Sequence, residues 1–226
     1  MIPDDSDLDG TEVPWALQVV VRVEKNPAPQ HTAVLCATAS TVAVALAAFT
    51  SPDADEHTRA RTERWRSGPI RKVVRRARGA GWTRQLAVSG VFVRQFYGVE
   101  VAVHVPGPVD EVDPEIARLQ VGGLNLEDTE PVDLPDAYVR LFLNPHVDLT
   151  TGKAAAQVGH AAQLVLQSIP VDRGDAWVAA GAPVQLVPTD EASWDHLLAT
   201  APVVVTDGGF TEVAPGTVTV LATHPW

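Results

Sequence analysis

Cysteine is almost absent from this chain of 226 residues, and so are several common catalytic motifs. The single cysteine, Cys36, excludes an internal disulfide framework and suits a reducing compartment, so we expect a cytoplasmic protein. The histidines are scattered, and neither paired cysteines nor a His-Glu-x-x-His pattern is present, which argues against a zinc site. The chain also lacks the Gly-x-Ser-x-Gly elbow of many serine hydrolases and the phosphate-binding loop of nucleotidases.

Targeting and membrane signals are weak. The start, Met1 to Asp7, has neither the basic region nor the apolar core of a signal peptide. Residues 32–49 carry no charge and are about long enough to span a bilayer, but they contain four hydroxyl side chains and lack close basic flanks. We therefore expect a buried helix and no membrane partner.

Positive charge is concentrated in one segment of an acidic chain. The net charge is −11, yet residues 59–84 hold ten of the seventeen arginines and lysines and one acid, so this segment carries +9 and the remainder −20. Such asymmetry indicates a polyanion site. The alternative is a solvated face that balances the acidic half. The candidate RNA-binding residues are Arg71, Lys72, Arg75, Arg76 and Arg78.

The same segment has the apolar spacing of an amphipathic helix. Pro69 suits a first helical position, and apolar residues recur from Ile70 to Ala77 at intervals of three and four. We expect a helix here with the arginines on its outer face. Trp65 and Trp82 bracket it and are expected to be core anchors rather than platforms for base stacking.

Two similar halves follow one another along the chain. Each begins with a buried strand and a long Ala/Val-rich helix, and one shift places Val19 on Leu141 and Val42 on Leu164 without a gap. We expect an α/β protein of two tandem three-layer α/β/α-like domains, each with a small mixed four-stranded sheet flanked by helices. The expected units are a first domain at 14–105, a linker at 106–136 with one short helix, and a second domain at 137–226.

A lysine opens the helix of the second half, although a positive charge there opposes the helix dipole. Lys153, Gln157 and His160 form one narrow polar stripe on a helix that is otherwise almost entirely apolar. Such a stripe is expected to face a cavity. Because local rules are broken here, we expect a functional reason.

The run GKAAAQVGHAAQ, together with VVTDGGFT and PGTVT near the end of the chain, resembles the signature of type 2 peptidyl-tRNA hydrolases. The resemblance covers residues 138–226 and implies a mixed four-stranded sheet flanked by helices, dimerisation, and cleavage of the ester between a peptide and tRNA without metal or cofactor. It also implies six site residues in this sequence: Lys153, Gln157, His160, Asp207, Thr211 and Thr219.

The chemistry of these residue types fits ester hydrolysis, which needs an activated water and donors for a developing oxyanion. Asp207 is expected to act as a base or to orient one. Lys153 offers a cation beside free helix N–H groups, and Gln157 a donor to the carbonyl. The plainer readings are that Asp207 only forms a turn, that His160 is a structural histidine, and that the two threonines are ordinary strand residues.

The chain departs from the resembled pattern at three positions, where Asn144, His146 and Val187 replace an arginine, an aspartate and a lysine. The first half has lost the polar stripe and is expected to be a degenerate copy that supplies phosphate contacts within an intramolecular pseudo-dimer. The rival functions are a catalytically inactive tRNA- or RNA-binding protein and a scaffold that binds a partner. Pairing of whole chains stays open.

Overall fold

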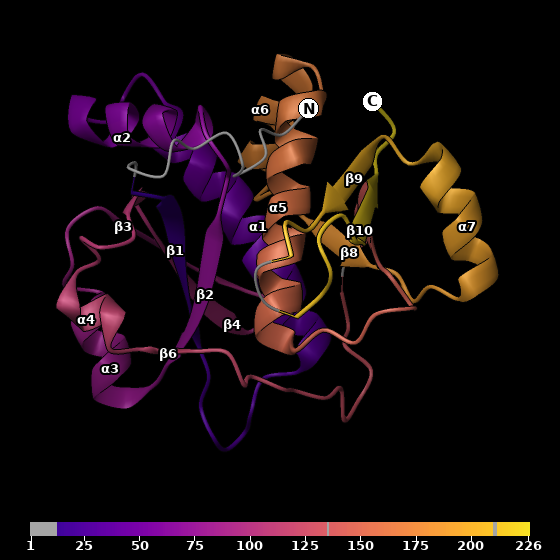
Figure 1. The fold of residues 1–226 in the computed structure, drawn as a ribbon, viewed down its shortest axis with the longest axis horizontal. Helices are drawn as coiled ribbons and strands as arrows, with labels where there is room; N and C mark the ends of the chain where they lie inside the picture. Colours follow the sequence, from indigo (N-terminus) through magenta and orange to yellow (C-terminus); the bar gives the residue numbers. More distant parts are fainter. Residues whose placement is uncertain (1–12, 135, 210–211) are drawn as a thin grey trace.

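Two mixed β-sheets flank a pair of long helices that pack side by side through the middle of the molecule (Figure 1). The computed structural model describes residues 13–134, 136–209 and 212–226. The central helices are α1 (His31–Thr50) and α5 (Thr151–Ser168). Because the two helices come from different halves of the chain, their contact joins the halves through one hydrophobic core.

The first sheet belongs to the first half and has the order β3-β4-β1-β2-β6, with β5 pairing at the end of β1. Strands β1 and β2 are parallel, and the other neighbours are antiparallel. Helices α2, α3 and α4 complete this half. The elements are β1 (Trp15–Arg22), α2 (Glu56–Arg66), β2 (Lys72–Ala77), α3 (Gly79–Gln85), β3 (Val91–Phe96), β4 (Val99–His104), β5 (Gly107–Pro108), α4 (Pro114–Ala117) and β6 (Gln120–Val121).

The second sheet has the four strands expected from the sequence, in the order β8-β7-β10-β9. Strands β7 and β8 are parallel, and β10 is antiparallel to both β7 and β9. Helices α6 and α7 complete the second half. The elements are β7 (Val139–Leu143), α6 (Val171–Ala179), β8 (Val184–Leu186), α7 (Glu191–Thr200), β9 (Val203–Thr206) and β10 (Val218–Thr223).

The strand path β2-β1-β4-β3 in the first sheet has the same order and directions as β8-β7-β10-β9 in the second. Each half also ends its second helix with a buried tryptophan. The indole of Trp65 donates to the carbonyl of Arg71 at 3.1 Å, and that of Trp177 donates to the carbonyl of Pro183 at 3.0 Å. Each acceptor immediately precedes the second strand of its half.

Residues 106–136 differ from the expected linker. They contain β5, α4 and β6, and both strands pair with the first sheet, which therefore has six strands rather than four. The short helix expected here is α4, capped by Asp113, whose side chain accepts from the Glu115 N–H. The predicted linker thus contributes structure to the first half.

The predicted basic helix is wrong, because residues 72–77 form strand β2. Val73 and Val74 are β-branched and fit a strand, and parallel pairing with β1 satisfies the backbone. Val74 packs in the main core and Ala77 in a smaller cluster around Trp82, so successive side chains face opposite sides of the sheet. A short apolar run of this kind fits the period of a helix as well as that of a strand, and pairing with β1 stabilises the strand.

Helix α1 is buried as expected, with fourteen of its residues in the interior. By length and composition it is the one helix among the described residues that is able to cross a membrane, but 78% of its apolar window is buried inside the structure. Trp65 and Trp82 are 1% and 4% exposed, which confirms their expected role as core anchors.

Candidate functional site

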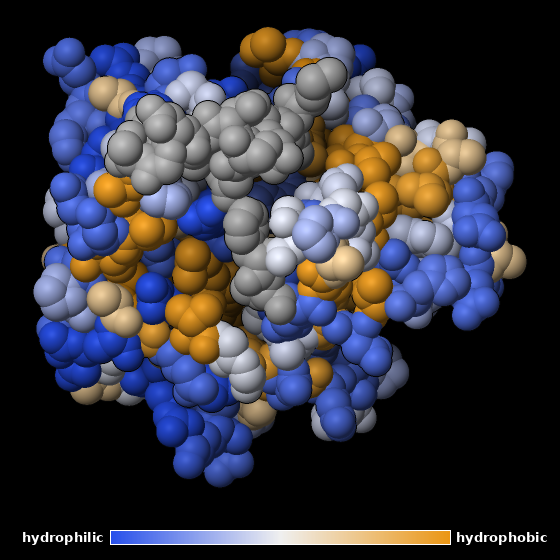
Figure 2. Space-filling view, viewed as in Figure 1, coloured by the Kyte–Doolittle hydropathy of each residue, from blue (hydrophilic) through white to orange (hydrophobic). Residues whose placement is uncertain are grey.

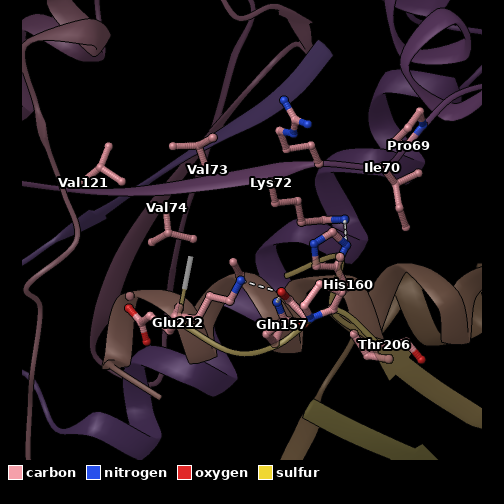
Figure 3. A pocket seen from close by; sticks show the side chains of 18 of the residues that line it. Pro69, Ile70, Lys72, Val73, Val74, Val121, Gln157, His160, Thr206 and Glu212 are labelled. Atoms are coloured by element: carbon pink, nitrogen blue, oxygen red, sulfur yellow. Dashed lines mark hydrogen bonds and ion pairs between the residues drawn. The ribbon is translucent and has the colours of Figure 1, made fainter. Parts of the chain in front are cut away.

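A cavity of about 630 Å³ lies between strand β2 of the first half and helix α5 of the second. Figure 3 shows Lys72, Val73 and Val74 on one side of it, with Gln157 and His160 on the other. In the space-filling view, hydrophobic residues gather around the hollow beside β2 (Figure 2). The cavity has the size of a small-molecule binding site, and both halves of the chain form its walls.

Lys153 and Asp207 form an ion pair at the floor of this cavity. Lys153 Nζ lies 2.5 Å from Asp207 Oδ2, and their side chains are 13% and 6% exposed. Thr150 caps α5 through the Lys153 N–H, and Asp207 follows β9, where the Gly209 N–H donates to its Oδ1 at 2.7 Å. The carboxylate therefore balances the positive charge that the helix N-terminus disfavours.

Gln157 and Thr219 extend this pair into a hydrogen-bonded network. Gln157, one turn after Lys153, donates from Nε2 to Asp207 Oδ2 at 2.6 Å. Thr219 on β10 donates from Oγ1 to Gln157 Oε1 at 2.7 Å. Thr219 and the carboxylate together set the orientation of the amide, since the opposite orientation would place two oxygens against each other. These four residues are called the Lys153–Asp207–Gln157–Thr219 network.

His160 contacts a lysine from the other half of the chain. Lys72 Nζ lies 3.2 Å from His160 Nδ1 (Figure 3). It also lies 2.5 Å from Gln163 Oε1. Burial and the charges of Lys72 and Lys153 hold the pKa of His160 well below its usual value, so this imidazole is neutral at pH 7. Gly159 leaves room for Lys72, because a Cβ there would lie 3.3 Å from Lys72 Cδ.

Lys72 itself is a buried amine at the edge of the cavity. It is 7% exposed, and burial lowers its pKa well below the usual value for lysine. Its Nζ lies 5.0 Å from the centre of the Trp65 ring. Among the described residues, no carboxylate forms an ion pair with it.

The six candidate residues of the second half have different placements. Lys153, Gln157, Asp207 and Thr219 are joined in one network, and His160 lines the same cavity without contacting that network. Thr211 lies outside the described residues. Two of the helix N–H groups that were expected to be free have partners, because the Gly152 N–H donates to the Leu124 carbonyl and the Lys153 N–H to Thr150.

The candidate RNA-binding residues lie on or beside strand β2, and their side chains are in different surroundings. Arg71 and Lys72 line the cavity. Arg75 instead bonds to Gln18 and to the carbonyls of Ala117 and Leu119, and Arg76 bonds to Gln120 and the Gly123 carbonyl. Arg78 is exposed at the start of α3. The five residues thus do not form one basic face.

The three positions that depart from the resembled pattern lie outside the cavity lining. Asn144 donates to the Val218 carbonyl at 2.7 Å and accepts from the His146 N–H at 2.8 Å, so it fixes the turn after β7. Val187 packs against the cluster of Phe142, Trp194 and Leu221. These contacts give the positions structural roles.

The first half has no counterpart of the network at its aligned positions. His31 contacts the Thr151 hydroxyl at 2.9 Å, and Leu35 and Thr38 are buried in the core. Sequence reasoning assigned Lys72 to phosphate binding and missed Gln163 as its partner. The scarcity of lysine was a usable signal, since only Lys25, Lys72 and Lys153 occur.

Among the described residues, no group of three or more His, Cys, Asp or Glu side chains is placed to hold a metal ion. Comparison of the chain with models of known protein families gives no match, and comparison with curated proteins gives none either.

The buried amine of Lys72 predicts a pH dependence of stability. Between the lowered pKa of folded Lys72 and the usual value near 10.5, the unfolded chain binds a proton that the folded chain does not. The free energy of unfolding should therefore rise with pH in this window, by up to about 1.4 kcal/mol per pH unit. Urea unfolding from pH 8 to 10 should show a steeper rise for the native protein than for Lys72→Met. Equal slopes would contradict a lowered pKa for Lys72 in the folded protein.

Proposed function

We propose that the protein hydrolyses the ester bond of peptidyl-tRNA, with the Lys153–Asp207–Gln157–Thr219 network as its catalytic centre. The observation that carries this proposal is that Lys153, Gln157 and Asp207 meet in one hydrogen-bonded network in the lining of a cavity. Thr219 is fully buried behind them and holds Gln157 in place. Networks of ionisable and amide groups in a cleft are typical of catalytic sites. The resemblance to type 2 peptidyl-tRNA hydrolases rests on these same residues.

The hydrogen-bond donors and acceptors that the network leaves unused suit ester hydrolysis. A carboxylate has about four lone-pair sites, and the described residues donate to three of those on Asp207. The remaining site on Oδ1 accepts a proton from the attacking water and returns it to the ribose oxygen of the tRNA when the ester C–O bond breaks. Among the described residues, two N–H groups of Lys153 and one of Gln157 are left over after their bonds to Asp207, and in this proposal they stabilise the oxyanion that forms on the ester carbonyl.

The two halves have different tasks in this proposal. The second half performs the chemistry, and the first half forms the opposite wall of the cavity and supplies phosphate contacts. Exposed arginines at the end of α2, which include Arg66, lead directly into the cavity-lining residues Pro69 to Arg71. The basic segment and the site therefore meet at one rim.

The two halves are copies of one ancestral unit in this proposal, an intramolecular pseudo-dimer with one working site. The shared strand order and the paired tryptophan hydrogen bonds support it. Neither metal nor cofactor takes part in the proposed steps. Since the proposed substrate is a product of translation, we expect the protein to act in the cytoplasm.

The test is release of labelled N-acetyl-amino acid from N-acetyl-aminoacyl-tRNA by the purified full chain. We expect multiple turnovers with the native protein and none above background with Lys153→Ala/Asp207→Asn. Full activity in the double variant would disprove the site assignment. Salt-sensitive tRNA binding without turnover would favour the rival, an inactive tRNA-binding protein. A native protein with neither tRNA binding nor turnover would favour a scaffold that binds a partner.

A further inference from the structure

The side chains of helix α5 that line the cavity change from polar to apolar along the helix. Lys153, Gln157, His160 and Leu164 line it in sequence order, and eleven residues of helix separate the first from the last. At 1.5 Å per residue the cavity wall on this helix is roughly 16 Å long. The proposed catalytic network occupies one end, and the reacting ester occupies little of this length.

The other end of the cavity has apolar side chains beside the polar residues Arg71 and Thr206. Pro69, Ile70 and Leu164 line it, and Figure 3 shows Pro69 and Ile70 on the same side of the view as His160 and Thr206. Val73 and Val74 continue the apolar wall towards the network. Partly exposed apolar side chains that gather in a cavity mark the part of a site that takes an apolar ligand group.

One polar side chain, His160, also lines this part of the cavity. Lys72 Nζ lies 3.2 Å from His160 Nδ1, and with Lys72 as the donor in this contact the imidazole proton is on Nε2. Among the described residues Nε2 has no hydrogen-bond partner, although His160 lines the cavity. A neutral N–H donor within an apolar wall binds an uncharged acceptor such as an amide carbonyl.

We propose that this end of the cavity is an acyl-binding subsite for an N-blocked amino acid with an apolar side chain. The side chain packs against Ile70 and Leu164, and the amide carbonyl accepts a hydrogen bond from His160 Nε2. Lys72 is a positioning residue from the first half that sets the tautomer of His160. That the bound group is the acyl part of the scissile ester rests on the proposed function; its binding does not.

The test is an NMR titration of the full chain, labelled with ¹⁵N-histidine, with N-acetyl-L-leucinamide as the probe. We expect the native protein to show His160 protonated on Nε2 and to bind this probe at least about tenfold more tightly than N-acetylglycinamide or N-acetyl-aspartamide. Leu164→Asp should weaken binding by about tenfold or more, whereas Leu198→Asp, at an exposed leucine on α7, should leave it unchanged.

Lys72→Met tests the positioning role separately, because it removes the donor at similar length. We expect the His160 ring signals to lose their preference for the Nε2–H form and the probe to bind more weakly, while the variant stays folded. Protonation of native His160 on Nδ1, or tighter binding of N-acetyl-aspartamide, would overturn the proposal. Leucinamide binding in a protein without hydrolase activity would uphold the subsite and reject only the proposed reaction.

Discussion

Replacing Asp207 with asparagine is expected to lower kcat for release of the acyl group from N-acetyl-aminoacyl-tRNA by about 10²–10⁴-fold. An asparagine has no carboxylate to accept a proton from water. It also leaves the ammonium of Lys153, 13% exposed, without its counterion. Single-turnover hydrolysis with saturating enzyme measures this loss separately from tRNA binding.

Two further variants sharpen this expectation. Lys153→Met should cause a comparable loss, and the double variant should lose little more than either single one, because the two residues act as a unit. The matched control is Asp195→Asn, an exposed aspartate on α7, which should keep the native rate. A rate for Asp207→Asn within threefold of the native rate would remove Asp207 from the mechanism.

Trp65→Ala is expected to reduce the free energy of unfolding by about 3–5 kcal/mol, as is typical of truncating a buried tryptophan. Trp65 is 1% exposed, and its ring supports Lys72 below the cavity. The loss of unfolding free energy comes from the void that the missing indole leaves. The Arg71 carbonyl keeps a partner, because the Leu17 N–H also donates to it at 2.9 Å. Urea unfolding at pH 7 measures the effect.

Trp65→Phe provides the control for the indole N–H, since it keeps most of the ring and removes the donor. We expect a clearly smaller loss than for alanine. Trp177→Ala, at the corresponding position of the second half, should cost a similar amount, because Trp177 is 4% exposed and makes the same kind of hydrogen bond. A loss below about 1 kcal/mol for Trp65→Ala would mean that the site relaxes without a void.

Most elements of the second half were predictable from local patterns, but helix α6 was not expected. The strands of this half, its long helix and the polar stripe of Lys153 and Gln157 follow from periodicity over long, consistent segments. That Asp207 and Thr219 meet this stripe is a long-range event, and only the resemblance linked them in advance. The structure supplies the contacts that periodicity alone does not specify.

The segment around β2 was misread for a physical reason. The apolar spacing of Ile70, Val73, Val74 and Ala77 fits a helix, but parallel pairing with β1 along residues 72–77 overrides it. Sequence reasoning therefore placed Lys72 on a solvated face. The strand instead directs it into the cavity, where it contacts His160.

Short pairing segments were also beyond prediction. Strands β5 and β6 have two residues each and form only because β1 and β2 are already in place to pair with them. Segments this short have no period of their own to detect. A Pro- and Gly-rich composition indicated a linker, and tertiary contacts turned it into part of the first sheet.

The most direct test of the central claim measures tRNA binding and ester cleavage on the same samples of native protein and Asp207→Asn. The site described here predicts that both bind N-acetyl-aminoacyl-tRNA with similar affinity and that the native protein alone releases the N-acetyl-amino acid. Native protein that binds this tRNA and leaves the ester intact would contradict a hydrolase and leave a tRNA-binding protein that retains the fold.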